Sequence, residues 1–71
     1  MKKQGLLEKL AEVFEEERVE ASQMLEDLIW DSLTKMAIIA LYHDELDIEL
    51  TPAELDKVET IQDLLDLANV A

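Results

Sequence analysis

The sequence predicts an all-α protein, a small four-helix bundle of three longer helices and one short helix, with a long loop between the first and second helices. Its 71 residues contain one glycine and one proline, and 49% of them are hydrophobic. Apolar residues recur mainly at spacings of three and four, which is typical of helix faces rather than of strands. A chain of this length is expected to form a single domain, residues 1–71.

Acidic residues dominate the charge of the chain. Eighteen Asp and Glu residues against six Lys and Arg residues give a formal net charge of −12 at pH 7. Such a surface repels nucleic acid and anionic membranes, and it steers the protein toward basic patches on partners. No apolar run is long enough to span a membrane, and the N-terminus lacks the apolar segment of a signal peptide. We therefore expect a cytoplasmic, monomeric protein that binds no nucleic acid and has no membrane span.

The first helix is expected over about residues 3–17. Leu6, Leu10 and Phe14 share one helical face, and glutamates occupy the opposite face. Residues 19–30 then form the long loop. Because this loop contains many apolar residues, we expect it to pack against the bundle, with one short turn at about residues 22–25.

The second helix is expected over about residues 32–45, and it is apolar almost all the way round. A surface helix normally has one apolar stripe, so this pattern predicts one side in the core and a second side offered to a partner. Asp31 or Ser32 caps the helix, because either side chain can accept from the free N–H groups of the first turn. The positive end of the helix dipole makes Ser32 a favourable place to carry a phosphate.

The remaining elements are shorter. Residues 47–50 alternate polar and apolar, and we expect an extended connection whose Ile48 and Leu50 reach the core. Thr51 as the cap, with Pro52 after it, predicts a short helix over about residues 52–57. Thr60 is expected to cap the last helix, whose apolar face is Ile61, Leu64, Leu65, Leu67 and Ala68. The largely buried positions are predicted to include Phe14, Ile38, Leu46, Ile61 and Leu65.

No residues suggest catalysis or a metal site. The chain has no cysteine and one histidine, His43, so the usual zinc ligand sets are absent from it. The sequence contains no nucleophile–base pair and no glycine-rich phosphate loop. We therefore expect no catalytic residues, no metal, and a function other than that of an enzyme.

Three stretches together resemble the acyl carrier protein family: Asp31-Ser32-Leu33, residues 44–50 (DELDIEL) and residues 54–66 (ELDKVETIQDLLD). The resemblance implies that Ser32 carries 4′-phosphopantetheine and that Asp31 helps to present it to a phosphopantetheinyl transferase. It also implies that the thiol of this arm carries acyl intermediates of fatty-acid or polyketide-type biosynthesis as thioesters.

The resemblance further assigns a partner-binding face to the second helix. This face would meet acyl-transferring or condensing enzymes that have basic docking patches, and it comprises Leu33, Met36, Ala37, Ala40, Asp44 and Glu45. The family often has acidic residues at the positions of Thr34 and Ala37, and Lys35 adds a positive charge beside them. This departure favours an alternative, a carrier of aminoacyl or other specialised acyl groups. An unmodified helical adaptor, which binds partners through the same helix, is the third hypothesis.

Overall fold

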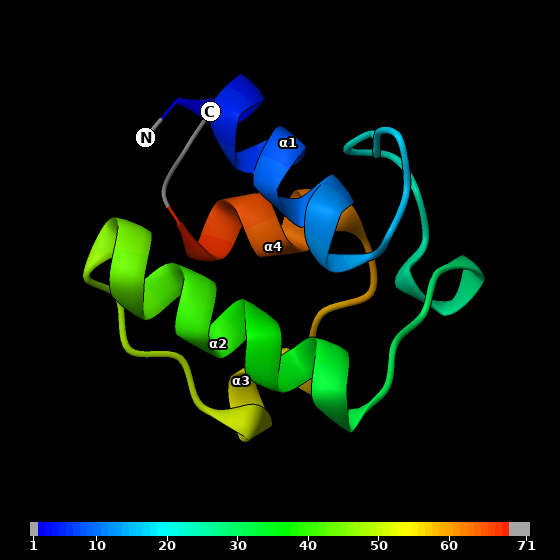
Figure 1. The fold of residues 1–71 in the computed structure, drawn as a ribbon. Helices are drawn as coiled ribbons and strands as arrows, with labels where there is room; N and C mark the ends of the chain where they lie inside the picture. Colours follow the sequence, from blue (N-terminus) through cyan, green and yellow to red (C-terminus); the bar gives the residue numbers. More distant parts are fainter. Residues whose placement is uncertain (1, 69–71) are drawn as a thin grey trace.

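The computed structural model describes residues 2–68, and this part of the chain contains four α-helices and no β-strand. In Figure 1, α1 and α4 lie on one side of α2, and the short α3 lies on the other. The all-α fold with a long connection between α1 and α2 is confirmed. The helices are α1 (Lys3–Val13), α2 (Ser32–Leu46), α3 (Pro52–Leu55) and α4 (Ile61–Leu67).

Helix α1 ends four residues earlier than predicted, at Val13 instead of residue 17. Glu15 adopts a left-handed conformation with φ of 59°. This turn lets the Glu16 amide donate to the Ala11 carbonyl (2.9 Å) and the Glu15 amide donate to the Glu12 carbonyl (3.2 Å). These two bonds form a Schellman-type helix end, which usually has glycine at the left-handed position. The chain therefore leaves the helix before its glutamate run can extend along the negative end of the dipole.

The long loop is fastened to the connection between α3 and α4. The Leu25 amide donates to the Glu59 carbonyl (2.9 Å), and the Ile61 amide donates to the Gln23 carbonyl (3.0 Å). Leu25 is also buried, so the prediction that the loop packs against the bundle is confirmed. Its one helical turn, a 3₁₀ turn, begins at Leu25, whereas the expected range was 22–25. These contacts therefore hold the part of the loop around Leu25, seven residues before Ser32, against the bundle.

The core takes side chains from all four helices and from the loop. Ten large side chains are almost completely inaccessible to solvent: Leu6, Leu10, Phe14, Leu25, Ile38, Tyr42, Leu55, Ile61, Leu64 and Leu65. Four of the five predicted core positions are therefore confirmed. The exception is Leu46, in the last turn of α2, which is only partly buried. Leu50 reaches the core as expected, whereas Ile48 is only partly buried.

Tyr42 connects α2 to α4 through a buried hydrogen bond. Its hydroxyl donates to the Leu64 carbonyl, inside the core. Burial raises the pKa of the Tyr42 hydroxyl above its usual value. The hydroxyl therefore stays protonated as a donor, and α2 is held with a defined side toward the core.

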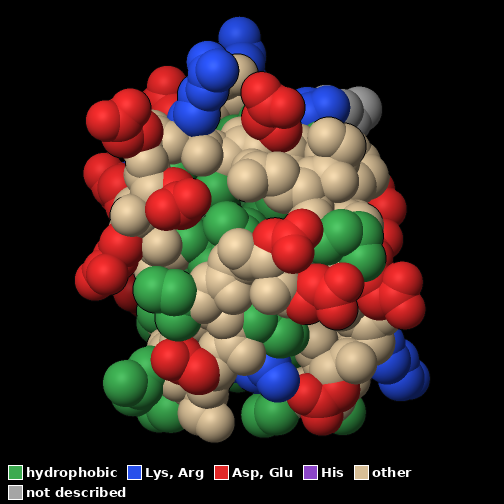
Figure 2. Space-filling model, turned by 90° about the vertical axis from the view of Figure 1, so that its right-hand side faces the viewer, with side chains coloured by type: hydrophobic (Ala, Val, Ile, Leu, Met, Phe, Trp, Pro, Cys, Tyr) green, Lys and Arg blue, Asp and Glu red, His purple; other side chains and the backbone are tan. Residues whose placement is uncertain are grey.

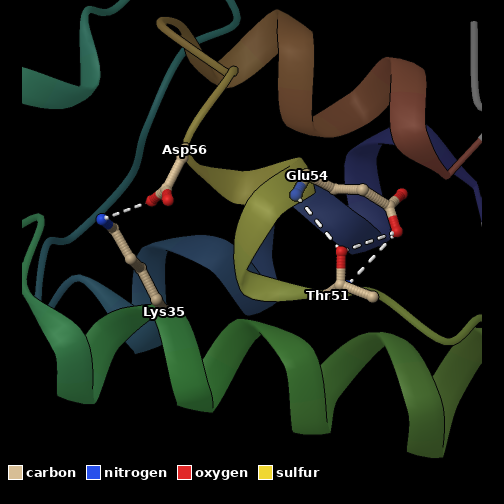
Figure 3. A network of polar contacts seen from close by, with 4 residues as sticks. All are labelled: Lys35, Thr51, Glu54 and Asp56. Atoms are coloured by element: carbon tan, nitrogen blue, oxygen red, sulfur yellow. Dashed lines mark hydrogen bonds and ion pairs between the residues drawn. The ribbon is translucent and has the colours of Figure 1, made fainter.

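Side-chain caps fix the starts of α3 and α4, as predicted. Thr51 and Glu54 form a reciprocal capping box at α3, which Figure 3 shows. Thr60 and Asp63 form the same arrangement at α4. Hydrogen bonds from the Glu59 and Thr60 amides lower the pKa of the Asp63 carboxyl. Helix α3 ends at Leu55, before the expected end at residue 57.

Candidate functional site

Helix α2 begins at Ser32, and Asp31 is the residue that caps it. The backbone of Asp31 is extended, and its carboxylate Oδ1 accepts a hydrogen bond from the Thr34 amide at 2.9 Å. This bond is the main reason that the pKa of the Asp31 carboxyl is lowered from its ordinary value. Of the two residues that the sequence allowed as the cap, Asp31 therefore takes the role. Ser32 is the first helical residue.

Ser32 presents a primary hydroxyl to solvent at the positive end of the helix. Ser32 and its neighbours Asp31 and Leu33 are all exposed. The amides at a helix start and the helix dipole favour a negatively charged group there. The only other serine, Ser22, is also exposed but lies in a turn of the loop. The structure thus gives Ser32 both the accessibility and the local electrostatics that a phosphate ester requires.

The six residues predicted to meet partners all lie at the surface. Leu33 and Met36 are among the most exposed large hydrophobic side chains, at 77% and 64% of their full exposure. The other four, two of them acidic, are also exposed: Ala37, Ala40, Asp44 and Glu45. We call these six residues the α2 outer face. That partners bind there is a prediction from the resemblance.

Thr34 does not belong to the exposed side of α2. Among residues 2–68 it is the one buried residue classed as polar or charged, with 7% of its surface exposed, and the Asp31 carboxylate accepts a hydrogen bond from its amide. Its lack of charge is therefore explained by burial and says nothing about partners. Ala37 is exposed. Of the two positions at which the family often has acidic residues, only Ala37 therefore lacks a charge that a partner could contact.

Two shallow grooves flank the outer face. The larger, of about 560 Å³, is lined mainly by Met36, Ile39 and Ala40 of α2 and by the connection before α3. The smaller, of about 310 Å³, includes Leu33 and Ile29 in its lining. Both begin within about one helical turn of Ser32, which is about 5.4 Å along the axis. A group attached to Ser32 therefore has apolar surface available on either side.

Lys35 and Trp30 form a second feature at the start of α2. The Lys35 ammonium lies 3.2 Å from Asp56 Oδ1 and 5.4 Å from the centroid of the Trp30 ring. Trp30 is partly buried, and its ring centroid lies 6.1 Å from that of Phe14. Sequence reasoning did not identify the contact with Asp56, since the two residues are 21 positions apart. The spacing of residues along one helix predicts which of its side chains are in contact, whereas contacts between two helices depend on the fold.

The acidic side chains are distributed rather than gathered into one site. Figure 2 shows them spread over one side of the molecule, with hydrophobic side chains reaching the surface between them. His43 is exposed, and its Nδ1 lies 3.4 Å from Asp44 Oδ1. Over residues 2–68, no three His, Asp or Glu side chains lie close enough together to hold a metal ion. In the same range, no helix has the length and apolar character needed to cross a bilayer.

Comparison with known proteins gives two findings. Residues 4–68 match a family model described as "Phosphopantetheine attachment site". The chain is also 35% identical over 54 residues to a protein named "Acyl carrier protein" from Thermosynechococcus vestitus (strain NIES-2133 / IAM M-273 / BP-1), and the alignment covers 76% of this chain and 67% of that relative. No solved structure matches the chain significantly.

Proposed function

This chain belongs to the phosphopantetheine attachment-site family, and from that premise we propose that Ser32 is the residue to which its 4′-phosphopantetheine is attached. The cofactor itself follows from the family, as does the role of a carrier protein rather than a catalyst. A carrier of this kind interacts with a phosphopantetheinyl transferase, which installs the arm, and with biosynthetic enzymes, which use it. What the family leaves open is the residue, the cargo and the individual enzymes.

The observation that carries the assignment is the position of Ser32 as an exposed first helical residue directly after a side-chain cap. Because Asp31 satisfies the Thr34 amide, the Ser32 hydroxyl is not needed as a cap. The exposed apolar residues of the α2 outer face begin at the next position, Leu33. An enzyme that reacts with the arm therefore has contact surface next to the attachment point.

The cargo that we propose is an acyl intermediate of fatty-acid or polyketide-type biosynthesis. The named relative is an acyl carrier protein, and Asp44 and Glu45 keep acidic charge on the outer face for partners with basic patches. The second candidate is an aminoacyl or other specialised acyl group. It is favoured by the uncharged, exposed Ala37 and by Lys35, which make the first turns of α2 less acidic.

Intact mass tests the attachment. The protein is incubated with coenzyme A and a phosphopantetheinyl transferase, in parallel with Ser32→Ala and with Ser22→Ala as the matched control. We expect one added phosphopantetheine on the wild type and on Ser22→Ala, and none on Ser32→Ala. Full modification of Ser32→Ala would assign the arm to another residue. An unmodified wild type would favour the helical adaptor.

The cargo is tested on the loaded protein. A malonyl-transferring enzyme of fatty-acid synthesis and an enzyme that activates amino acids are each offered the loaded carrier, and the mass of the thioester is read. Malonyl transfer supports the first candidate. Aminoacyl transfer without malonyl transfer supports the second.

A further inference from the structure

The Lys35 side chain places a positive charge at the same end of α2 as Ser32. Side chains on an α-helix lean toward its N-terminus. The Lys35 ammonium follows this rule, because it lies 5.4 Å from the ring of Trp30, a residue that precedes Ser32 by two positions. The cation therefore reaches back along the helix, level with the start of α2.

Ser32 and Lys35 are also neighbours on the helix surface. Residues three apart have their Cβ atoms roughly 5–6 Å apart, and a lysine side chain is long enough to cover this distance. Lys35 is the only Lys or Arg between Arg18 and Lys57 in the sequence. A phosphodiester on Ser32 would add negative charge beside Asp31, so Lys35 is the one cation of this segment that can balance it.

The present partner of Lys35 holds it weakly. Asp56 lies just after α3, and its carboxylate meets the ammonium at 3.2 Å, as Figure 3 shows. The Asp56 side chain is 66% exposed, whereas that of Lys35 is 27% exposed. An ion pair with so exposed a carboxylate contributes little to stability, because water solvates the carboxylate nearly as well as the ammonium does. An ammonium has three donors, so it can also bind a second anion without leaving the first.

We propose that Lys35 is a positioning residue for the prosthetic arm: its ammonium binds the phosphate on Ser32 and fixes the root of the arm on the side of α2 that faces α3. The proposal rests on attachment at Ser32. A phosphate that is covalently held next to the cation competes well with a hydrated carboxylate, because it has a high effective concentration. The Trp30 ring keeps the ammonium at this end of α2 when it binds the phosphate.

Phosphorus NMR of the loaded protein tests the proposal. Loading is first confirmed by mass, so failure of attachment would be recognised as failure of the proposed function and not of this inference. We expect the phosphorus resonance of Lys35→Gln to differ from that of the wild type by more than its linewidth. Lys35→Arg should keep the wild-type position, and Lys57→Gln, which removes an exposed lysine outside this segment, should have no effect.

Asp56→Asn separates direct contact from an indirect effect through α3. If Lys35 binds the phosphate, the loaded Asp56→Asn protein keeps the wild-type resonance. If Lys35 acts only by holding α3, Asp56→Asn reproduces the shift of Lys35→Gln, and the proposal is wrong. A second measurement needs no variant. The nitrogen chemical shift of the Lys35 ammonium should differ between the unloaded and the loaded wild type, and this difference should be larger than the one for the Lys57 ammonium. Equal phosphorus resonances in wild type and Lys35→Gln would also overturn the proposal.

Discussion

The two sides of α2 are both rich in apolar residues, but they have different surroundings. One side, with Ile38 and Tyr42, is completely buried against the core. The other carries Leu33 and Met36, each with more than half of its surface exposed. Apolar character alone therefore does not identify the core side of this helix. The buried side supports folding, whereas the exposed side contributes little to it.

We propose that the exposed side of α2 contacts partners. Contiguous apolar patches on a protein surface usually mark an interaction site. On this helix the patch begins next to Ser32 and ends at the acidic pair Asp44 and Glu45. Such a surface gives a partner both apolar contact and electrostatic steering, which favours fast encounter without long residence. A carrier that visits several enzymes needs this combination.

The largest expected difference between the two sides is in stability. Ile38→Ala removes a fully buried side chain and should lower the free energy of unfolding by about 2–5 kcal/mol. Met36→Ala, on the exposed side, should change it by no more than about 0.5 kcal/mol. Chemical denaturation followed by circular dichroism measures both. Equal losses in the two variants would show that the outer face is also structural.

A smaller effect is expected in loading of the arm. Leu33→Ala should reduce kcat/KM for a phosphopantetheinyl transferase by about tenfold, equivalent to about 1.4 kcal/mol, while stability stays the same. The reason is that Leu33, 77% exposed, adjoins the attachment point and can contact the enzyme directly. Met24→Ala, which removes a side chain that is 37% exposed but lies in the loop, is the control. If both variants load like the wild type, the transferase does not use the outer face at Leu33.

The smallest expected effect concerns the cap at the start of α2. Asp31→Asn keeps an acceptor for the Thr34 amide but removes the charge. In the folded protein the pKa of Asp31 is lowered from 3.8, so the unfolded state binds the proton more tightly. The stability that the carboxylate adds is therefore present above about pH 4 and is lost as the pH falls through the lower, folded pKa. The melting temperature of the wild type should exceed that of Asp31→Asn at about pH 6, and the gap should narrow as the pH falls below about 4; a gap independent of pH would contradict this origin.

Much of the fold could be predicted because local signals agree with the tertiary structure. Asp31, Thr51 and Thr60 are strong cap residues, and each starts its helix in the structure. The end of α1 could not be predicted in this way. Its left-handed residue is Glu15 rather than glycine, and a left-handed conformation costs a residue other than glycine roughly 1–2 kcal/mol. Packing of the buried Phe14 can offset such a cost, but packing cannot be read from local sequence.

The candidate site shows the same difference between features set by local sequence, which could be predicted, and features set by packing, which could not. The cap at Asp31 and the second apolar side of α2 could be predicted from the pattern along one helix, whereas the roles of Ser32 and of the α2 outer face came from the resemblance to the family. It did not show that Thr34 turns into the core, since helix spacing cannot tell which of two apolar sides is buried. It also missed the ion pair of Lys35 and Asp56, which exists only because α3 packs beside α2. Contacts within a helix were predictable, and contacts between helices were not.

The most direct test of this account locates the arm on the chain. The protein is loaded with a phosphopantetheinyl transferase and coenzyme A and then digested, and each peptide that contains a serine is fragmented in a mass spectrometer. The account predicts that the phosphopantetheine mass lies on Ser32, at the exposed start of α2. A modification on Ser22 or on a threonine, with Ser32 unmodified, would contradict it.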